Sequence, residues 1–298
     1  MYKIRVPAST SNLGPGFDCL GLAFRIYNTF AFETSDQYCL ENTEPRFSTP
    51  DNLFLQAYRS TFAPGEEIPA LHVVFETDIP VSRGLGSSAA MTVAGIAAGH
   101  IIRKDKPDGA AWLKEAVAFE HHPDNAAPAL FGGLTACITD PDGTLHMHAL
   151  QLAENLRFTL LIPDAEVSTE KARSILPDTY PRGTAVHNAS HAVYLTEALR
   201  TGDMDLLKTA AVDLLHEPYR KTLIPDFDTV KKTVTEDTDG VFLISGSGST
   251  CLLISERPLS AAASEAIHLL PDHWQIRTAE VCTEGIEIME DSLWHRII

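Results

Sequence analysis

The sequence predicts an α+β fold, in which strands and helices are mixed without a regular alternation. The chain has 298 residues, of which 44% are hydrophobic, so it is long enough for one large core or two modest ones. Strand-like and helix-like segments follow one another irregularly, which favours α+β over a doubly wound parallel sheet. We expect a division near Leu156, with one domain over residues 1–155 and a second over residues 156–298.

The first half is expected to combine an N-terminal pair of strands with helices that follow a glycine-rich loop. Alternating residues at Tyr2–Val6 and a β-rich run at Ala23–Glu33 predict the two strands. The further elements expected here are a helix over Asn52–Ser60, a strand over Leu71–Thr77, helices over Ala89–Ile102 and Ala110–Glu120, and a strand over Leu134–Thr139 before a hairpin turn at Asp140–Gly143.

The second half is expected to mix short strands with longer helices. Strands are predicted at Phe158–Ile162, Val241–Ser245 and Cys251–Ser255, and the last two flank a small-residue loop at Gly246–Thr250. Helices are predicted at Thr169–Leu176, Ala185–Arg200, Met204–Leu215, Phe227–Glu236 and Ser260–Leu269.

Composition limits the classes of partner. With 23 Lys and Arg against 40 Asp and Glu, the net charge of −17 argues against general nucleic-acid binding. Five cysteines, none in a Cys-x-x-Cys pair, fit free thiols in a reducing compartment. The chain opens without a charged-then-apolar leader, and no apolar stretch reaches membrane-spanning length. We therefore expect a cytoplasmic protein without a membrane partner.

Residues 80–90 carry the clearest chemical content. They are Pro80, Val81, Ser82, Arg83, Gly84, Leu85, Gly86, Ser87, Ser88, Ala89 and Ala90. The two glycines allow a tight turn that brings backbone N–H groups close to an anion, and the paired serines supply hydroxyls where a helix is expected to begin. A glycine loop at a helix N-terminus is suited to phosphate, because its unpaired amides and the helix dipole favour negative charge.

Three interpretations of this loop compete. The P-loop pattern requires a lysine after its second glycine, and no lysine lies between Arg83 and Arg103. A dinucleotide fingerprint is matched only loosely, by Gly84, Gly86 and Ala89, and the loop lies far from the start of the chain. The third interpretation is a plain turn between a strand and a helix, and the tandem serines favour an anion site over it.

Two other polar segments offer candidate ligands. In the turn-rich segment Pro7–Gly21, Asn12 and Asp18 are able to hydrogen-bond an alcohol, although such residues also stabilise ordinary turns. In Glu120–Asn125, five polar side chains stand at a break between helices. They offer the oxygen ligands that Mg²⁺ prefers, whereas the adjacent histidines have the wrong spacing for a zinc site.

Two arginines stand in suggestive surroundings. Arg173 follows Thr169 by one helical turn, and Arg220 ends the run His216–Arg220. Arginine binds a carboxylate or a phosphate through two parallel hydrogen bonds, which suits an amino-acid substrate. A surface salt bridge is the alternative for each of them.

Three separated motifs follow one another along the chain. The first is Pro7–Asp18, the second is Pro80–Ala90 and the third is Ser245–Thr250. In this order they resemble the GHMP kinase superfamily and, within it, the homoserine kinase family, over nearly the whole chain. The part specific to that family is Asn12–Asp18 together with His122–Asn125, Ser168–Arg173 and Pro218–Arg220.

The resemblance implies a fold and an activity. The fold would be the two-domain GHMP kinase fold, with an N-terminal mixed α/β domain that contains the glycine-serine loop and a C-terminal ferredoxin-like α/β sandwich. The activity would be ATP-dependent phosphorylation of the L-homoserine hydroxyl in threonine biosynthesis, with Mg²⁺·ATP and L-homoserine bound and a homodimer as the family expectation. The alternatives are another GHMP small-alcohol kinase, of the mevalonate type, or a non-catalytic metabolite sensor of that fold.

The resemblance also assigns roles to residues of this sequence. The loop Pro80–Ala90 would wrap the ATP phosphates, and Asn52 would contact the nucleoside. Ser88 and Glu120 match the Mg²⁺-coordinating positions. The substrate pocket would consist of Asn12, Asp18, His122, Asn125, Thr169, Arg173 and Arg220, with Asp18, Asn125, Glu120 and Ser88 as the catalytic set.

The match leads to a hypothesis about proton transfer. Related kinases place an aspartate base near Asp124-Asn125, where homoserine kinases have an asparagine. We therefore expect Asp18 and Asn125 to orient the hydroxyl, while its proton passes late to a phosphate oxygen. Two residues depart from the family pattern, since His121 stands where glycine is commoner and Ser249 replaces a proline.

Overall fold

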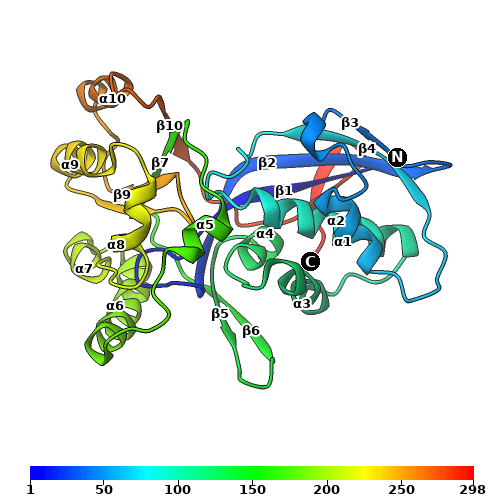
Figure 1. Ribbon diagram of the computed structural model, residues 1–298, viewed down its shortest axis with the longest axis horizontal. Helices are drawn as coiled ribbons and strands as arrows, with labels where there is room; N and C mark the ends of the chain where they lie inside the picture. Colours follow the sequence, from blue (N-terminus) through cyan, green and yellow to red (C-terminus); the bar gives the residue numbers. More distant parts are fainter.

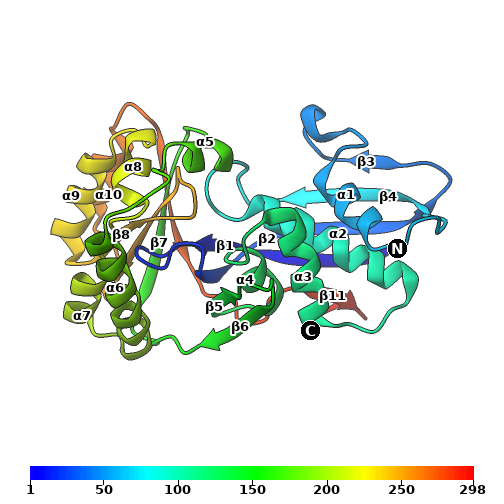
Figure 2. The same cartoon turned by 60° about the horizontal axis from the view of Figure 1, so that its bottom comes forward.

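The computed structural model describes residues 1–298 and contains two β-sheets, each packed against helices (Figures 1 and 2). One sheet has eight strands and the other has four. The helices are grouped around these sheets rather than alternating regularly with parallel strands. The predicted α+β class is therefore confirmed. No helix combines the length and the apolar character needed to cross a membrane.

The eight-stranded sheet is built around the long N-terminal hairpin. Its main path runs β12-β11-β1-β2-β4-β3, while β5 pairs with β2, and β6 pairs with β5. All of these pairs are antiparallel except β3 with β4. The strands are β1 (Tyr2–Ser11), β2 (Leu20–Ser35), β3 (Cys39–Glu41), β4 (Ala70–Thr77), β5 (Leu134–Thr139), β6 (Leu145–Leu150), β11 (Glu287–Glu290) and β12 (Leu293–Arg296).

Four helices cover one face of this sheet (Figure 1). They are α1 (Leu53–Ser60), α2 (Ser87–Arg103), α3 (Gly109–Glu120) and α4 (Ala126–Phe131), and η1 (Pro45–Phe47) precedes them. The small residues of α2 allow close packing, because a Cβ on Gly95 would lie 2.3 Å from the Phe54 carbonyl oxygen of α1. The aromatic rings of Phe30, Phe54 and Phe75 join sheet and helix in the buried core.

The four-stranded sheet has the strand order β10-β7-β9-β8 and is antiparallel throughout. Its strands are β7 (Arg157–Pro163), β8 (Val241–Ile244), β9 (Cys251–Ser255) and β10 (Trp274–Ala279). Helices lie between β7 and β8 and between β9 and β10, so the chain follows the βαββαβ pattern of a ferredoxin-like fold. The predicted ferredoxin-like sandwich is confirmed.

Both faces of the second sheet are covered. Alternate residues on one face pack against α6 (Arg182–Thr201) and α7 (Met204–Ala210), and residues on the other pack against α9 (Phe227–Thr238) and α10 (Ala261–His268). Figure 1 shows these two helix pairs on opposite sides of the strands. The remaining helices are α5 (Thr169–Ser174), α8 (Glu217–Arg220) and η2 (Lys221–Leu223).

The structure differs from the sequence-based elements in two places. The helix predicted over Met204–Leu215 ends at Ala210, because the Asp213 carboxylate accepts backbone N–H bonds from Leu215, His216 and Glu217 and starts α8 instead. The sequence pattern also missed β3, β10, β11 and β12. Since β11 pairs with β1, the end of the chain joins the sheet of the first half, and the division at residue 155 stays a prediction.

Candidate active site

A cleft of about 260 Å³ collects most of the predicted site residues. It is bounded by the loop before α2, by the segment between α3 and α4, and by residues of α5 and α8. Of the predicted residues, Asn12, Asn52, Pro80–Ala89, Glu120, His122, Asn125, Thr169, Arg173 and Arg220 line it. Ala90 is buried within α2 and does not line the cleft, and Asp18 reaches it only through Arg173.

The glycine-serine loop requires its two glycines. Gly84 and Gly86 have φ values of +71° and +70°, in the left-handed region. A Cβ on Gly86 would lie 2.1 Å from Ser9 Oγ, and one on Gly84 would lie 2.1 Å from the Ser245 carbonyl oxygen. Helix α2 begins directly after Gly86, so its first N–H groups are left without helical acceptors at the cleft. This arrangement suits the binding of an anion.

Ser88 and Glu120 meet at the start of α2 and the end of α3. Ser88 Oγ donates to Glu120 Oε1 at 2.8 Å, and Thr92 Oγ1, one turn further along α2, donates to the same oxygen at 2.9 Å. Glu120 is followed by His121, whose φ of +64° ends the helix. Hydroxyl and carboxylate oxygens at this spacing fit the donor set that Mg²⁺ takes beside phosphate oxygens.

Asn125 is fixed by hydroxyls of β1. Its Oδ1 accepts from Ser9 Oγ, and its Nδ2 donates to Ser11 Oγ, both at 2.9 Å. One N–H of the amide is left for a ligand in the cleft. The two serines thus determine the orientation of Asn125.

His122 and Asp124 form a second polar pair at this break. His122 Nδ1 lies 3.0 Å from Asp124 Oδ1, and Asp124 is 1% exposed. Burial lowers the pKa of His122, but the bond to Asp124 raises it, and the net shift is upward. The bond to Asp124 therefore holds the imidazole in place and stabilises its charged form against the cost of burial.

Asp18 and Arg173 form a bidentate ion pair. Arg173 Nη2 and Nη1 lie 2.6 and 3.1 Å from the two carboxylate oxygens of Asp18. The backbone N–H of Asp18 donates to Asn12 Oδ1 at 3.0 Å, and Asn12 Nδ2 donates to the Gly246 carbonyl oxygen at 2.7 Å. Asn12 therefore holds the turn that presents Asp18.

Arg220 is buried without a carboxylate partner. Its side chain is among the largest fully buried ones, and its exposed fraction is 1%. Its Nε and Nη1 donate to the carbonyl oxygens of Ala172 and Gly246, at 3.2 and 2.9 Å, and its guanidinium lies over the Phe17 ring. Burial, reinforced by the charge of Arg173, lowers the pKa of Arg220 to about 10. An anionic ligand in the cleft would relieve this cost.

The third motif, Ser245–Thr250, forms hydrogen bonds with both of the other motifs. The Ser245 hydroxyl donates to the Gly84 carbonyl oxygen at 2.7 Å, and Thr250 N–H donates to the Arg83 carbonyl oxygen at 3.1 Å. The Gly246 N–H donates to the Ser11 carbonyl oxygen at 3.0 Å, and Ser249, in the position of the family's proline, bonds to the Ala165 carbonyl oxygen. The motif supports the cleft mainly through backbone contacts, although Ser247 also lines it.

The sequence alone did not identify the apolar residues that line part of the cleft. Phe47, Leu53, Met91 and Val167 also line the cleft. Their spacing along the chain gives no motif, so only the fold brings them together. Asn52, the one residue predicted near the nucleoside, caps α1 by accepting the Phe54 N–H at 2.9 Å.

Comparison with known proteins agrees with this geometry. The family model for the GHMP kinase N-terminal domain matches residues 52–133, and the model for the C-terminal domain matches residues 195–269. The first segment contains the glycine-serine loop with Glu120 and Asn125. The second contains the end of α6 and helices α7 to α10.

Similar proteins extend the match over nearly the whole chain. A homoserine kinase from Clostridium botulinum is 37% identical over 287 residues, which cover 94% of this chain and 96% of the relative. The crystal structure of homoserine kinase from Cytophaga hutchinsonii has a TM-score of 0.83 at 26% identity, over 97% of each chain. The structure of a putative homoserine kinase from Listeria monocytogenes has a TM-score of 0.81 at 28% identity, over 98% of this chain and 100% of that one. The chain therefore belongs to the homoserine kinase family of the GHMP kinases.

Proposed function

We propose that this protein transfers the γ-phosphoryl group of ATP to the side-chain hydroxyl of L-homoserine, giving O-phospho-L-homoserine and ADP in threonine biosynthesis. The observation that carries the proposal is the buried Arg220, which has no carboxylate partner beside a cleft that also contains the glycine-serine loop. The names of the relatives and of the two matched structures support the same activity.

The substrate end of the cleft is suited to an amino acid. Arg220 offers its remaining N–H groups to a carboxylate. The Arg173 guanidinium lies near the same Phe17 ring, 5.6 Å from the ring centre. The Asp18 carboxylate is the acceptor for an ammonium group in this neighbourhood. His122, Asn125 and Thr169 complete the polar lining.

The phosphate end is suited to ATP with Mg²⁺. Backbone N–H groups at the start of α2 replace the lysine of a P-loop in binding the phosphates. Ser88 and Glu120 would hold the Mg²⁺, and a bound Mg²⁺ neutralises charge on the phosphate oxygens. Phe47, Leu53 and Met91 provide apolar surface for the base, beside Asn52.

The chain's own residues contribute mainly positioning. Phosphoryl transfer has a loose, charged transition state, so orientation and electrostatic stabilisation supply most of the catalysis. Asn125, held by Ser9 and Ser11, and Asp18, held by Arg173, orient the hydroxyl, and its proton passes late to a phosphate oxygen. If Asp124→Asn abolished turnover while keeping substrate affinity and fold, Asp124 would instead be the base.

The same features distinguish the proposed activity from two alternative functions. A mevalonate-type kinase would not need a carboxylate such as Asp18 for an ammonium group, because mevalonate has none. A non-catalytic sensor would not need Ser88 and Glu120 to meet at the phosphate loop, as they do at 2.8 Å.

The five free cysteines support the expectation of a reducing compartment such as the cytoplasm, and a homodimer stays a prediction.

A coupled ADP-release assay tests the proposal. We expect L-homoserine, with Mg²⁺·ATP, to be phosphorylated in preference to L-threonine, mevalonate and shikimate. The absence of homoserine-dependent ADP release would refute the function, and a preference for mevalonate would move the protein to the other kinase class.

A further inference from the structure

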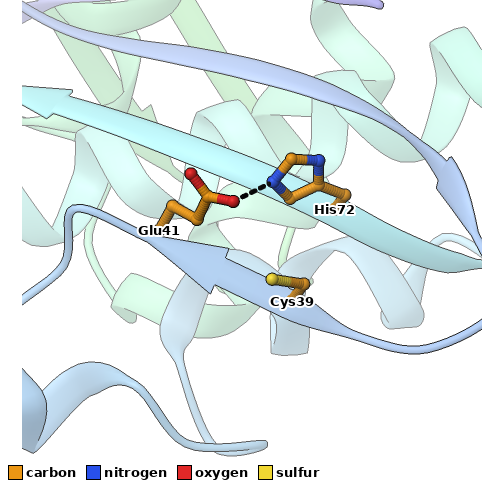
Figure 3. Close-up of side chains that lie close together, drawn as sticks. All are labelled: Cys39, Glu41 and His72. Carbon is orange, nitrogen blue, oxygen red and sulfur yellow. Dashed lines mark hydrogen bonds and ion pairs between the residues drawn. The ribbon is translucent and has the colours of Figure 1, made fainter.

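A small cluster of potential metal ligands lies at the edge of the eight-stranded sheet, apart from the cleft. It consists of Cys39 and Glu41 on β3 and His72 on β4 (Figure 3). One ligand atom from each side chain lies within 4.8 Å of the other two. His72 Nε2 lies 2.8 Å from Glu41 Oε1, and none of the three residues lines the cleft.

Strand geometry explains why these side chains share one face. Cys39 and Glu41 are two residues apart on β3, so they project from the same side of the strand. Leu40 between them packs against the core. The parallel register places Cys39 beside His72, whose neighbours Leu71 and Val73 are also directed into the core. The three polar side chains therefore project from the face of the sheet that is opposite its buried side.

We propose that Cys39, Glu41 and His72 form a binding site for a thiophilic divalent cation, with Zn²⁺ as the best fit. Thiolate, imidazole and carboxylate are all zinc ligands, and a water molecule completes a tetrahedral set. With Zn–S near 2.3 Å and Zn–N and Zn–O near 2.0 Å, a tetrahedral site needs ligand atoms roughly 3.3–3.6 Å apart. The cluster reaches this spacing by shifts of at most about 1.5 Å of these side chains, which rotamer changes supply.

The thiol distinguishes this cluster from the ordinary ion pairs of the surface. His146 lies 3.0 Å from the Asp140 carboxylate in a more exposed position than His72, and no cysteine lies with them in a ligand cluster. A soft sulfur ligand selects Zn²⁺ over Mg²⁺, which prefers oxygen ligands. The site is therefore chemically separate from the Mg²⁺ position at Ser88 and Glu120.

A bound ion would join β3 to the sheet. β3 has three residues and forms the edge of the main strand path. A metal that takes two ligands from β3 and one from β4 cross-links the two strands, so it stabilises the folded protein by mass action. Because the thiol must lose its proton, the affinity is expected to rise with pH.

Titration of the metal-free full chain with Zn²⁺ in competition with a chelating indicator tests the proposal. We expect one bound Zn²⁺ that Cys39→Ser and His72→Gln each weaken by more than about tenfold, since even loss of outer-shell partners has effects of that size. His146→Gln is the matched control and should leave the affinity unchanged. Co²⁺ in place of Zn²⁺ should give a thiolate charge-transfer absorption that Cys39→Ser removes.

Three results would overturn the proposal. They are the absence of saturable Zn²⁺ binding to the wild type, an affinity that survives both substitutions, or an equal loss in His146→Gln. Circular dichroism of each variant separates loss of the ligand from loss of the fold. Because the measurement is binding and not turnover, it is independent of the proposed kinase activity.

Discussion

Replacing Arg220 with methionine separates substrate binding from folding. The side chain is 1% exposed, has no carboxylate partner and donates to two backbone carbonyl oxygens. If it binds the substrate carboxylate, its loss removes one partner of a buried charge pair, at a cost of about 2–5 kcal/mol. We therefore expect Arg220→Met to raise the KM for L-homoserine about 30-fold to a few thousand-fold.

The expected effect of Arg220→Met on stability combines two opposing contributions. Burial lowers the pKa of Arg220 from its ordinary value to about 10, so the folded state disfavours the charge by about 3 kcal/mol at neutral pH. The variant loses that cost but also two charge-assisted hydrogen bonds, each worth about 1.5–3 kcal/mol. The Gly246 oxygen keeps its bond from Asn12. The net change in the free energy of unfolding is therefore at most about 3 kcal/mol.

Steady-state kinetics with both substrates and urea unfolding of the same preparation measure the two quantities. The KM for ATP should change by less than about threefold, because Arg220 belongs to the proposed substrate pocket and not to the apolar surface proposed for the base. An unchanged homoserine KM would refute the role of Arg220. Equal changes in the two KM values would show that the substitution disturbs the cleft as a whole.

Three further predictions concern the metal, the helix end and pH. Ser88→Ala and Glu120→Gln should each raise the Mg²⁺ concentration for half-maximal activity by about tenfold or more, equivalent to about 1.4 kcal/mol, in a Mg²⁺ titration at fixed ATP; unchanged titrations would remove these residues from the site. His121→Gly should stabilise the protein by about 0.5–1 kcal/mol in thermal unfolding, because His121 has a φ of +64°; a destabilised variant would contradict this. Burial raises the pKa of Glu217 from 4.5 to about 7, although the hydrogen bond from Ile244 N–H opposes this shift. The folded state therefore binds this proton more tightly than the unfolded state does. The resulting contribution to the free energy of unfolding, about 3 kcal/mol, is fully present below pH 4.5 and is lost as the pH rises through 7. Glu217→Gln should remove this part of the slope in urea unfolding between these pH values, and a slope that persists unchanged would refute the assignment.

The parts of the site that were predicted from sequence are those encoded in short continuous segments. The loop Pro80–Ala90 is one such segment, because its glycines and serines by themselves predict the start of a helix that binds anions. The pairing of Ser88 with Glu120 was predicted as a shared metal position, and the structure brings the two side chains to 2.8 Å. Their role in metal binding remains a prediction.

Other parts depend on contacts between distant segments. The need for glycine at position 84 comes from Ser245, 161 residues away, and the orientation of Asn125 comes from Ser9 and Ser11. The burial of Arg220 is equally invisible in the sequence, where an arginine beside a lysine resembles a surface residue.

The secondary-structure elements likewise differ in whether a continuous segment of the sequence is enough to predict them. The helices and strands with strong periodicity were predicted within a few residues, as for the strand Leu134–Thr139, which coincides with β5. The short strand β3 has three residues, too few for a periodic pattern, and the four-residue strand β11 is recognisable only through its pairing with β1 and β12. The ligand cluster of Cys39 and His72 depends on that same short strand.

The most direct test of the proposed activity is to identify the product formed from L-homoserine and Mg²⁺·ATP by phosphorus NMR. We expect one phosphate monoester on the side-chain oxygen of homoserine for each ADP released. We also expect the Arg220→Met variant to form the same ester only at much higher homoserine concentration. Release of ADP with free phosphate alone, or no reaction with homoserine, would contradict the proposed activity.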